Sequence, residues 1–156
     1  MHDHPTQGKR IAQELLTRLK APKKEISLIC ELVEWHMYDF DCKTKENKLR
    51  RFFVTHYPLL EPLLAVKQAD FSACMDDTSV APTVQKWRAL LQKMQQEQVP
   101  TSVKALAISG KDLLDLPLPP TAISKTLEKL LLHTAVFPQD NKKERLLKLA
   151  LSMQEK

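Results

Sequence analysis

Two clusters of side chains have residue types and spacing that suit chemistry, and the first stands at the start of the chain. His2, Asp3 and His4 are adjacent, and histidine and aspartate are common ligands of metal ions. Adjacent residues at a terminus point in different directions and are not preorganised, so we expect no metal site from these three alone. His4 and His36 are each a weak candidate for a metal ligand. A histidine next to a tryptophan, as His36 is, is more often a packed, hydrogen-bonded residue.

The second cluster is Ser109-Gly110-Lys111-Asp112, which has the pattern of a helix start. Serine is a preferred N-cap, and an acidic residue three positions later can accept a hydrogen bond from the N-cap backbone. The pattern therefore predicts a helix that begins at Gly110. Gly110 and Lys111 would stand at its positive end, where a phosphate oxygen is favoured. Lys104 shortly before adds another cation.

A basic segment, ENKLRRFFVTHY at 46–57, supplies the remaining candidates. The cations in this segment and just before it fall within two turns of one predicted helix and are Lys45, Lys48, Arg50 and Arg51. The whole chain carries 24 basic and 19 acidic residues, a formal net charge of +5. This modest excess is compatible with a nucleic-acid partner. A solvated helix face without a specific partner is the competing interpretation, because helix surfaces commonly carry such charges.

The elements that must position these residues are all expected to be helices. The 156 residues include only two glycines, and apolar residues recur at helical spacing between ten prolines that mark the breaks. We expect an irregular bundle of six to eight helices with a smaller C-terminal helical unit. The polar stretch 76–82 is the best boundary, which predicts domains at 1–78 and 79–156.

Helical periodicity also predicts which side chains face the core. The stripe from Trp87 to Met94 and the stripe from Ile123 to Leu131 should both point inward. Asn141, with Glu144 three positions later, predicts the start of the last helix.

The cysteines and the lengths of the apolar runs indicate in which cellular environment the protein works. Cys30, Cys42 and Cys74 are odd in number and lack C-x-x-C spacing, which favours reduced thiols. No apolar run is long enough to span a membrane, and no signal-peptide pattern is present. These features favour a cytoplasmic protein without a membrane partner.

The order of these segments resembles the C-terminal body and tail of bacterial tRNA nucleotidyltransferases and related poly(A) polymerases. Three motifs carry the resemblance: H-x-x-x-G-x-x-I-A-x-x-L-L from position 4 with E-W-H-M at 34–37, K-L-R-R-F-F at 48–53 with L-L-x-x-x-x-A-D at 63–70, and S-G-K-D-L-L at 109–114. A leucine- and proline-rich corner and a leucine-rich helix follow the last. The chain departs from the family where glycines are usual, with Pro117, Thr121 and Ser124 in their place.

The resemblance implies an RNA-binding helical region, with tRNA as the expected partner. Phosphates would be contacted by the basic residues and by the helix start described above; the candidates are Lys45, Lys48, Arg50, Arg51, Lys104, Ser109, Gly110 and Lys111. By spacing, His4 and His36 match the later histidines of the family's HD-type helical region, whereas its His-Asp pair would precede residue 1.

The family's metal-binding carboxylates lie in an N-terminal head that has no counterpart in these 156 residues. The resemblance therefore implies that the chain has no catalytic residues and no cofactor of its own, with magnesium expected only in that head, and that it does not transfer nucleotides alone. Two alternatives stay open. One is a remnant metal-dependent phosphohydrolase of the HD type, and the other is a helical protein-interaction or oligomerisation module.

Overall fold

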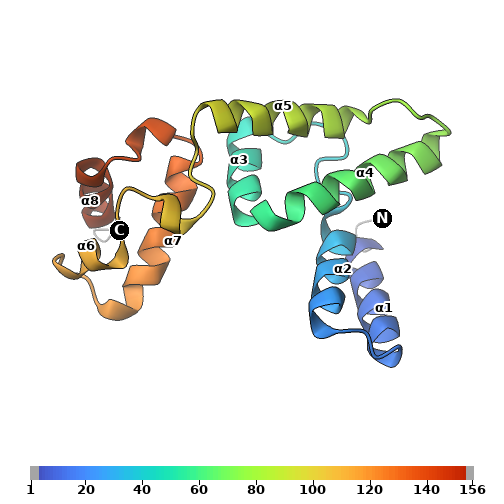
Figure 1. The fold of residues 1–156 in the computed structure, drawn as a ribbon, viewed down its shortest axis with the longest axis horizontal. Helices are drawn as coiled ribbons and strands as arrows, with labels where there is room; N and C mark the ends of the chain where they lie inside the picture. Colours follow the sequence, from blue (N-terminus) through green and yellow to red (C-terminus); the bar gives the residue numbers. More distant parts are fainter. Residues whose placement is uncertain (1–3, 154–156) are drawn as a thin grey trace. The chain divides into compact units, whose positions relative to one another are not determined.

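The described part of the chain folds into helices joined by loops and turns. The computed structural model describes the backbone of residues 4–153 and the side chains of residues 6–153. These residues contain no strand, which confirms the expected all-α class (Figure 1). The α-helices are α1 (His4–Arg18), α2 (Lys23–Trp35), α3 (Glu46–Thr55), α4 (Leu60–Met75), α5 (Pro82–Gln96), α6 (Gly110–Leu114), α7 (Ile123–Thr134) and α8 (Lys143–Ser152). Short 3-10 turns lie at Tyr57–Leu59, Val103–Ala105, Pro120–Ala122 and Pro138–Asp140.

The helices form two compact units that interleave along the sequence. The first unit contains the residues up to Thr44 together with Pro58–Ala89, and the second contains Lys45–Tyr57 and the residues from Leu90 onward. The division thus falls inside α5, and α3 belongs with the C-terminal helices. The expected boundary at 76–82 is instead a loop within the first unit. None of the helices in the described residues is both long and apolar enough to cross a membrane.

The first unit consists of a helical hairpin and two further helical segments. α1 and α2 pack against each other, and α2 also contacts α4 (Figure 1). Gly8 lets the hairpin close tightly, because a Cβ atom there would stand 3.1 Å from Cγ1 of Val33. The buried core of this unit includes Leu63, Leu64 and Trp87.

The second unit has its own apolar core, formed by α6, α7, α8 and the segment before α6. Its buried members are Leu106, Ile108, Leu113, Leu127, Leu130, Leu146 and Ala150. Both sequence stripes expected to face inward do so: Trp87, Leu90 and Met94 are buried, as are Leu127 and Leu130.

Replacing Leu127 with alanine should lower the free energy of unfolding by about 2–5 kcal/mol, as truncation of a buried leucine usually does. Leu127 is 8% exposed within this core. The matched control is Leu151→Ala in the same unit, because Leu151 is 40% exposed. Urea unfolding followed by circular dichroism would measure both, and equal small losses would show that the α7 stripe does not lie in the core.

The start of α8 differs from the sequence expectation. Asn141 is not its N-cap: that position is held by Lys142 without a side-chain cap. The Asn141 amide instead accepts a hydrogen bond from the backbone N–H of Ala107 at 2.8 Å and donates one to the carbonyl of Ala105 at 3.2 Å. The Asn141 side chain therefore makes a tertiary contact with a residue 34 positions away and does not cap α8, although its local spacing predicts a cap.

Candidate nucleic-acid interface

Positive charge is concentrated in the second unit. The segments 45–57 and 90–156 carry 14 lysines and arginines against 8 aspartates and glutamates, a formal net charge of +6. The first unit carries 10 against 11, a net charge of −1. The whole excess of basic residues therefore belongs to the unit that contains the predicted basic segments.

Three cations of α3 lie on its exposed side. Lys45, which precedes the helix as its N-cap, and Lys48 and Arg51 are all exposed. Residues three apart are neighbours on a helix surface, so the three side chains follow one edge of α3. Within the described part of the chain, none of them makes an ion pair. We name Lys45, Lys48 and Arg51 the α3 basic edge.

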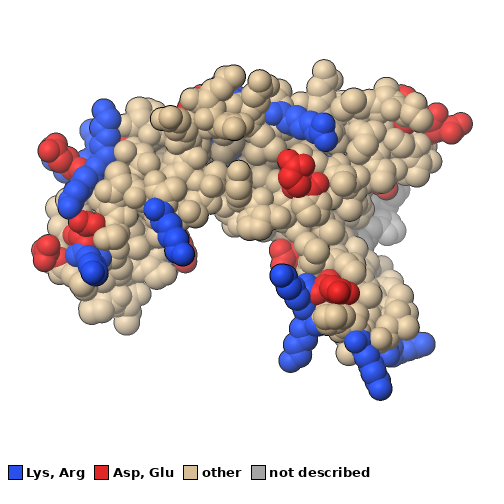
Figure 2. All heavy atoms as spheres, viewed as in Figure 1, with Lys and Arg blue, Asp and Glu red and all other residues tan. Residues whose placement is uncertain are grey.

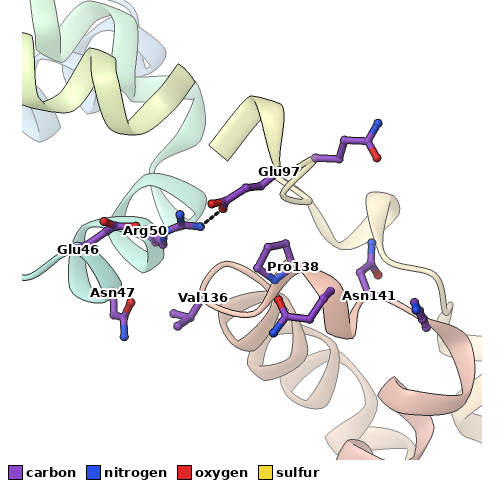
Figure 3. A pocket seen from close by; sticks show the side chains of 10 residues that line it. Glu46, Asn47, Arg50, Glu97, Val136, Pro138 and Asn141 are labelled. Atoms are coloured by element: carbon purple, nitrogen blue, oxygen red, sulfur yellow. Dashed lines mark hydrogen bonds and ion pairs between the residues drawn. The ribbon is translucent and has the colours of Figure 1, made fainter. Parts of the chain in front are cut away.

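Arg50 does not belong to this edge, which corrects the sequence expectation. Its side chain is only 4% exposed and donates from Nε to Glu46 at 2.8 Å and from Nη1 to Glu97 at 2.5 Å (Figure 3). Nη1 also lies 3.3 Å from the carbonyl oxygen of Ala135. The guanidinium therefore links α3 to the end of α5 and to the residue after α7, and it is not available to a phosphate.

The pKa values of the two carboxylates that contact Arg50 are lowered. The Arg50 guanidinium lowers the pKa of Glu97, whose carboxylate in turn raises the pKa of Arg50. The pKa of Glu46 is lowered first by Lys93, which donates to it at 2.8 Å, and then by Arg50. The Arg50 and Lys93 side chains and the two carboxylates together form a balanced network.

An open hollow of about 540 Å³ lies beside this network (Figure 3). Its wall includes the Glu46, Arg50 and Glu97 cluster and the apolar side chains Val136 and Pro138. Lys142 adds one further cation to the wall, so two acidic and two basic groups balance. A neutral hollow has no electrostatic preference for phosphate, and we assign no ligand to it.

The capped turn at residue 109 is present. A phosphate was expected at its helix start, but the Asp112 carboxylate there is paired with Lys143. α6 begins at Gly110, as predicted, and Oδ2 of Asp112 accepts hydrogen bonds from the backbone N–H of Ser109 at 2.7 Å and from its Oγ at 2.8 Å. Oδ1 of the same carboxylate lies 2.5 Å from Nζ of Lys143. Lys143 and Ser109 together hold the pKa of Asp112 well below its usual range.

This geometry removes the main reason to place a phosphate at Gly110. The helix has only five residues, and a carboxylate of the protein already stands at its start. Lys104 and Lys111 remain exposed cations of the second unit, each without an ion pair among the described residues. We therefore retain these two as charged groups and assign no anion site to Ser109 and Gly110.

The metal candidates gain no support from geometry. His36 is half-buried, and its Nδ1 lies 2.7 Å from the carbonyl oxygen of Val33, one turn earlier. His2 and Asp3 lie outside the described residues, and the side chain of His4 is not described. Among the side chains that the structure does describe, no three histidines, cysteines or acidic residues gather as a metal site would require.

A buried polar cluster in the first unit escaped the sequence interpretation. The fully buried carboxylate of Asp39 accepts hydrogen bonds from Nε1 of Trp87 at 3.0 Å, from the backbone N–H of Thr44 at 2.8 Å and from Nζ of Lys86 at 3.1 Å. Burial opposes its ionisation, but the hydrogen bonds from Trp87, Thr44 and Lys86 outweigh burial and lower the pKa of Asp39. Asp39 also adopts a left-handed backbone conformation with φ of 59°, which aspartate tolerates better than most residues.

Lys67, a buried cation, completes this cluster. Nζ of Lys67 donates to the carbonyl oxygens of His36 and Tyr38 at 2.7 and 2.5 Å and lies 4.6 Å from the ring centre of Trp87. Burial lowers the pKa of Lys67 to about 8. These contacts of Lys67 and Asp39 hold the segment after α2 against α4 and the first half of α5.

The comparisons with known proteins bring no further constraint. Models of protein families, curated protein sequences and solved structures all yield no match to this chain. The geometry of the α3 basic edge and the charge of the second unit are therefore the observations on which a functional proposal must rest.

Proposed function

We propose that the chain binds RNA, most favourably tRNA, through its second unit. The observation that carries the proposal is the net charge of +6 on that unit against −1 on the first. A locally concentrated basic surface is the electrostatic footprint of a nucleic-acid-binding protein, whereas evenly scattered charge is not. The motif order that resembles tRNA nucleotidyltransferases supports tRNA as the RNA and tRNA processing as the context.

The contacts would be made to phosphates and would not read bases. Lys45, Lys48 and Arg51 are long, exposed cations on one edge of a helix, and each can neutralise one phosphate as it displaces a counterion. Lys104 and Lys111 add exposed charge in the same unit. Such contacts position an RNA by its backbone and shape, which is how structured RNA is commonly recognised.

Acidic residues share this unit and limit how strongly it attracts RNA. Figure 2 shows red side chains among the blue ones over α6, α7 and α8. Asp112 neutralises Lys143, and Glu46 neutralises Lys93. None of the three residues of the α3 basic edge makes an ion pair among the described residues, so each should contribute more than the paired cations Lys143 and Arg145 of α8.

Replacing Lys48 and Arg51 together with alanine should weaken tRNA binding and flatten its salt dependence. Each lost phosphate contact should reduce the slope of log affinity against log salt by roughly 0.7–0.9. Both side chains are exposed, so the fold should be unaffected, which circular dichroism would verify. Fluorescence anisotropy with labelled tRNA would measure affinity at several salt concentrations.

The matched control is the double variant Lys23→Ala, Lys24→Ala. It removes the same charge from two exposed positions at the start of α2 in the first unit. We expect it to leave the slope nearly unchanged. Equal losses from the two double variants would mean that net charge alone drives the attraction, and that the α3 basic edge has no special role.

A further inference from the structure

The α1–α2 hairpin leaves a large apolar surface uncovered. Residues four apart along α1 share one face and are strongly exposed: Ile11 at 59%, Leu15 at 49% and Leu19 at 68%. On α2, Leu28 and Ile29 are exposed at 41% and 36%, and Leu32 next to them is half-buried. We name these six residues the hairpin face.

The contacts inside the hairpin show on which side the α1 stripe lies. Gly8 faces α2, because a Cβ atom there would almost touch Val33. Seen around the axis of α1, Lys9 projects to one side of this contact line, and Ile11 and Leu15 project to the other. Lys9 reaches Glu34 of α2 at 2.6 Å, so the side opposite to this ion pair is the apolar one.

The α2 stripe lies on the same side. Cys30 and Val33 face α1, since Sγ of Cys30 lies 3.8 Å from the carbonyl oxygen of Lys9. Around the axis of α2, Glu34 projects toward the ion-pair side, and Ile29 projects to the opposite side. Ile29 and Leu32 therefore lie on the same side of the hairpin as Ile11 and Leu15, and Leu28 lies at the outer edge of that side. The exposed Glu25, one turn before Ile29, shares this side near the turn of the hairpin.

We propose that the hairpin face binds the hairpin face of a second copy of this chain, forming a two-fold symmetric dimer with a four-helix core. Two helices make a single layer, and an apolar layer is stable only when a second layer covers it. Identical faces satisfy each other across a two-fold axis, which is the commonest symmetry of soluble oligomers. The resulting arrangement of helices is a four-helix bundle.

The size of the hairpin face suits a small interface between two copies. Helices of 15 and 13 residues are each about 20 Å long, and two adjacent helices are about 20 Å wide, so the face measures about 400 Å² in projection. This is about half of the 800 Å² per partner that a standard stable interface buries, so we expect a dimer that depends on concentration. A small peptide or a lipid tail would cover only part of it.

Charge favours the orientation in which the two hairpins point in opposite directions. Basic residues gather near the turn of the hairpin, where Figure 2 shows several blue side chains; they are Arg18, Lys20, Lys23 and Lys24. With Glu25 beside them, the turn end carries four basic groups and one acidic group, a formal charge of +3. The other end of the hairpin has two basic and three acidic residues, a formal charge of −1; they are Lys9, Arg10, Glu14, Glu31 and Glu34. Opposed hairpins keep the two basic turns apart and bring each one near the weakly acidic end of its partner.

The proposal predicts the mass of the purified chain in solution. Light scattering and sedimentation equilibrium should report twice the monomer mass of 17.9 kDa at micromolar concentrations. Ile11→Glu and Leu15→Glu, tested as separate variants, should each raise the dimer dissociation constant at least tenfold, because a carboxylate would be buried without a partner. Both side chains are exposed in the single chain, so helix content by circular dichroism should stay unchanged.

The control is Leu151→Glu, which places the same charge on an exposed leucine of α8 outside the hairpin face. It should leave the dimer intact. A wild-type chain that stays monomeric at high micromolar concentration would overturn the proposal and leave the hairpin face to another partner. A dimer that survives both hairpin substitutions would overturn it as well, by placing the contact elsewhere.

Discussion

Asp39→Ala should lower the free energy of unfolding by about 3–5 kcal/mol, the usual cost of removing one partner from a buried ion pair. The substitution leaves the indole N–H of Trp87, the backbone N–H of Thr44 and the ammonium of Lys86 without their shared acceptor. It also places alanine at a backbone φ of 59°, which L-residues other than asparagine, aspartate and glycine rarely adopt. Chemical unfolding at neutral pH would measure the loss.

Two further variants separate the causes of this loss. Asp39→Asn keeps a side chain that tolerates the left-handed backbone but replaces one acceptor oxygen with an amide donor, so it removes the charge and one acceptor without straining the backbone. Trp87→Phe removes a single donor and should cost about 1–2 kcal/mol from the unmade hydrogen bond and the changed packing. If Asp39→Ala cost no more than Trp87→Phe, the carboxylate would not be the centre of the cluster.

Arg50→Ala should destabilise the chain by about 3 kcal/mol, whereas Arg51→Ala, one position later, should change stability by less than about 0.5 kcal/mol. Arg50 is buried and bonded to Glu46, Glu97 and the backbone at Ala135, and its aliphatic stem packs inside the unit. Arg51 is exposed. Thermal and urea unfolding of the two variants under identical conditions would make the comparison.

The same pair distinguishes a structural arginine from an RNA-binding one. At temperatures where both variants remain folded, Arg51→Ala should reduce tRNA affinity and Arg50→Ala should not. A result in which Arg50→Ala is fully stable but loses tRNA binding would show that Arg50 leaves its carboxylate partners to contact RNA, contrary to the geometry described above.

Local pattern was sufficient to predict some features of this molecule. The helical class, the inward stripes of Trp87 to Met94 and Ile123 to Leu131, and the start of α6 at Gly110 all depend on neighbours within one or two turns. Periodicity and capping act over that range, so the sequence contains the necessary information.

The features that sequence did not predict depend on distant partners. Arg50 was placed with its basic neighbours because Glu97, its strongest partner, is 47 residues away. Asp39 gives no local signal in the sequence because its partner Trp87 is 48 residues away. The membership of α3 in the second unit has the same cause, since its contacts are with α7 far along the chain. Tertiary pairing decides each case, and no local signal reports it.

The most direct test of the central claim is the affinity of the wild-type chain for tRNA as a function of salt. If phosphate contacts through the second unit bind the RNA, log affinity should fall linearly with log salt. Two or more contacts would give a slope of about −1.4 or steeper, at 0.7–0.9 per phosphate. Replacing the α3 basic edge should flatten that slope. An affinity that does not change with salt, or no measurable tRNA binding at low salt, would contradict the proposal that this chain is an RNA-binding protein.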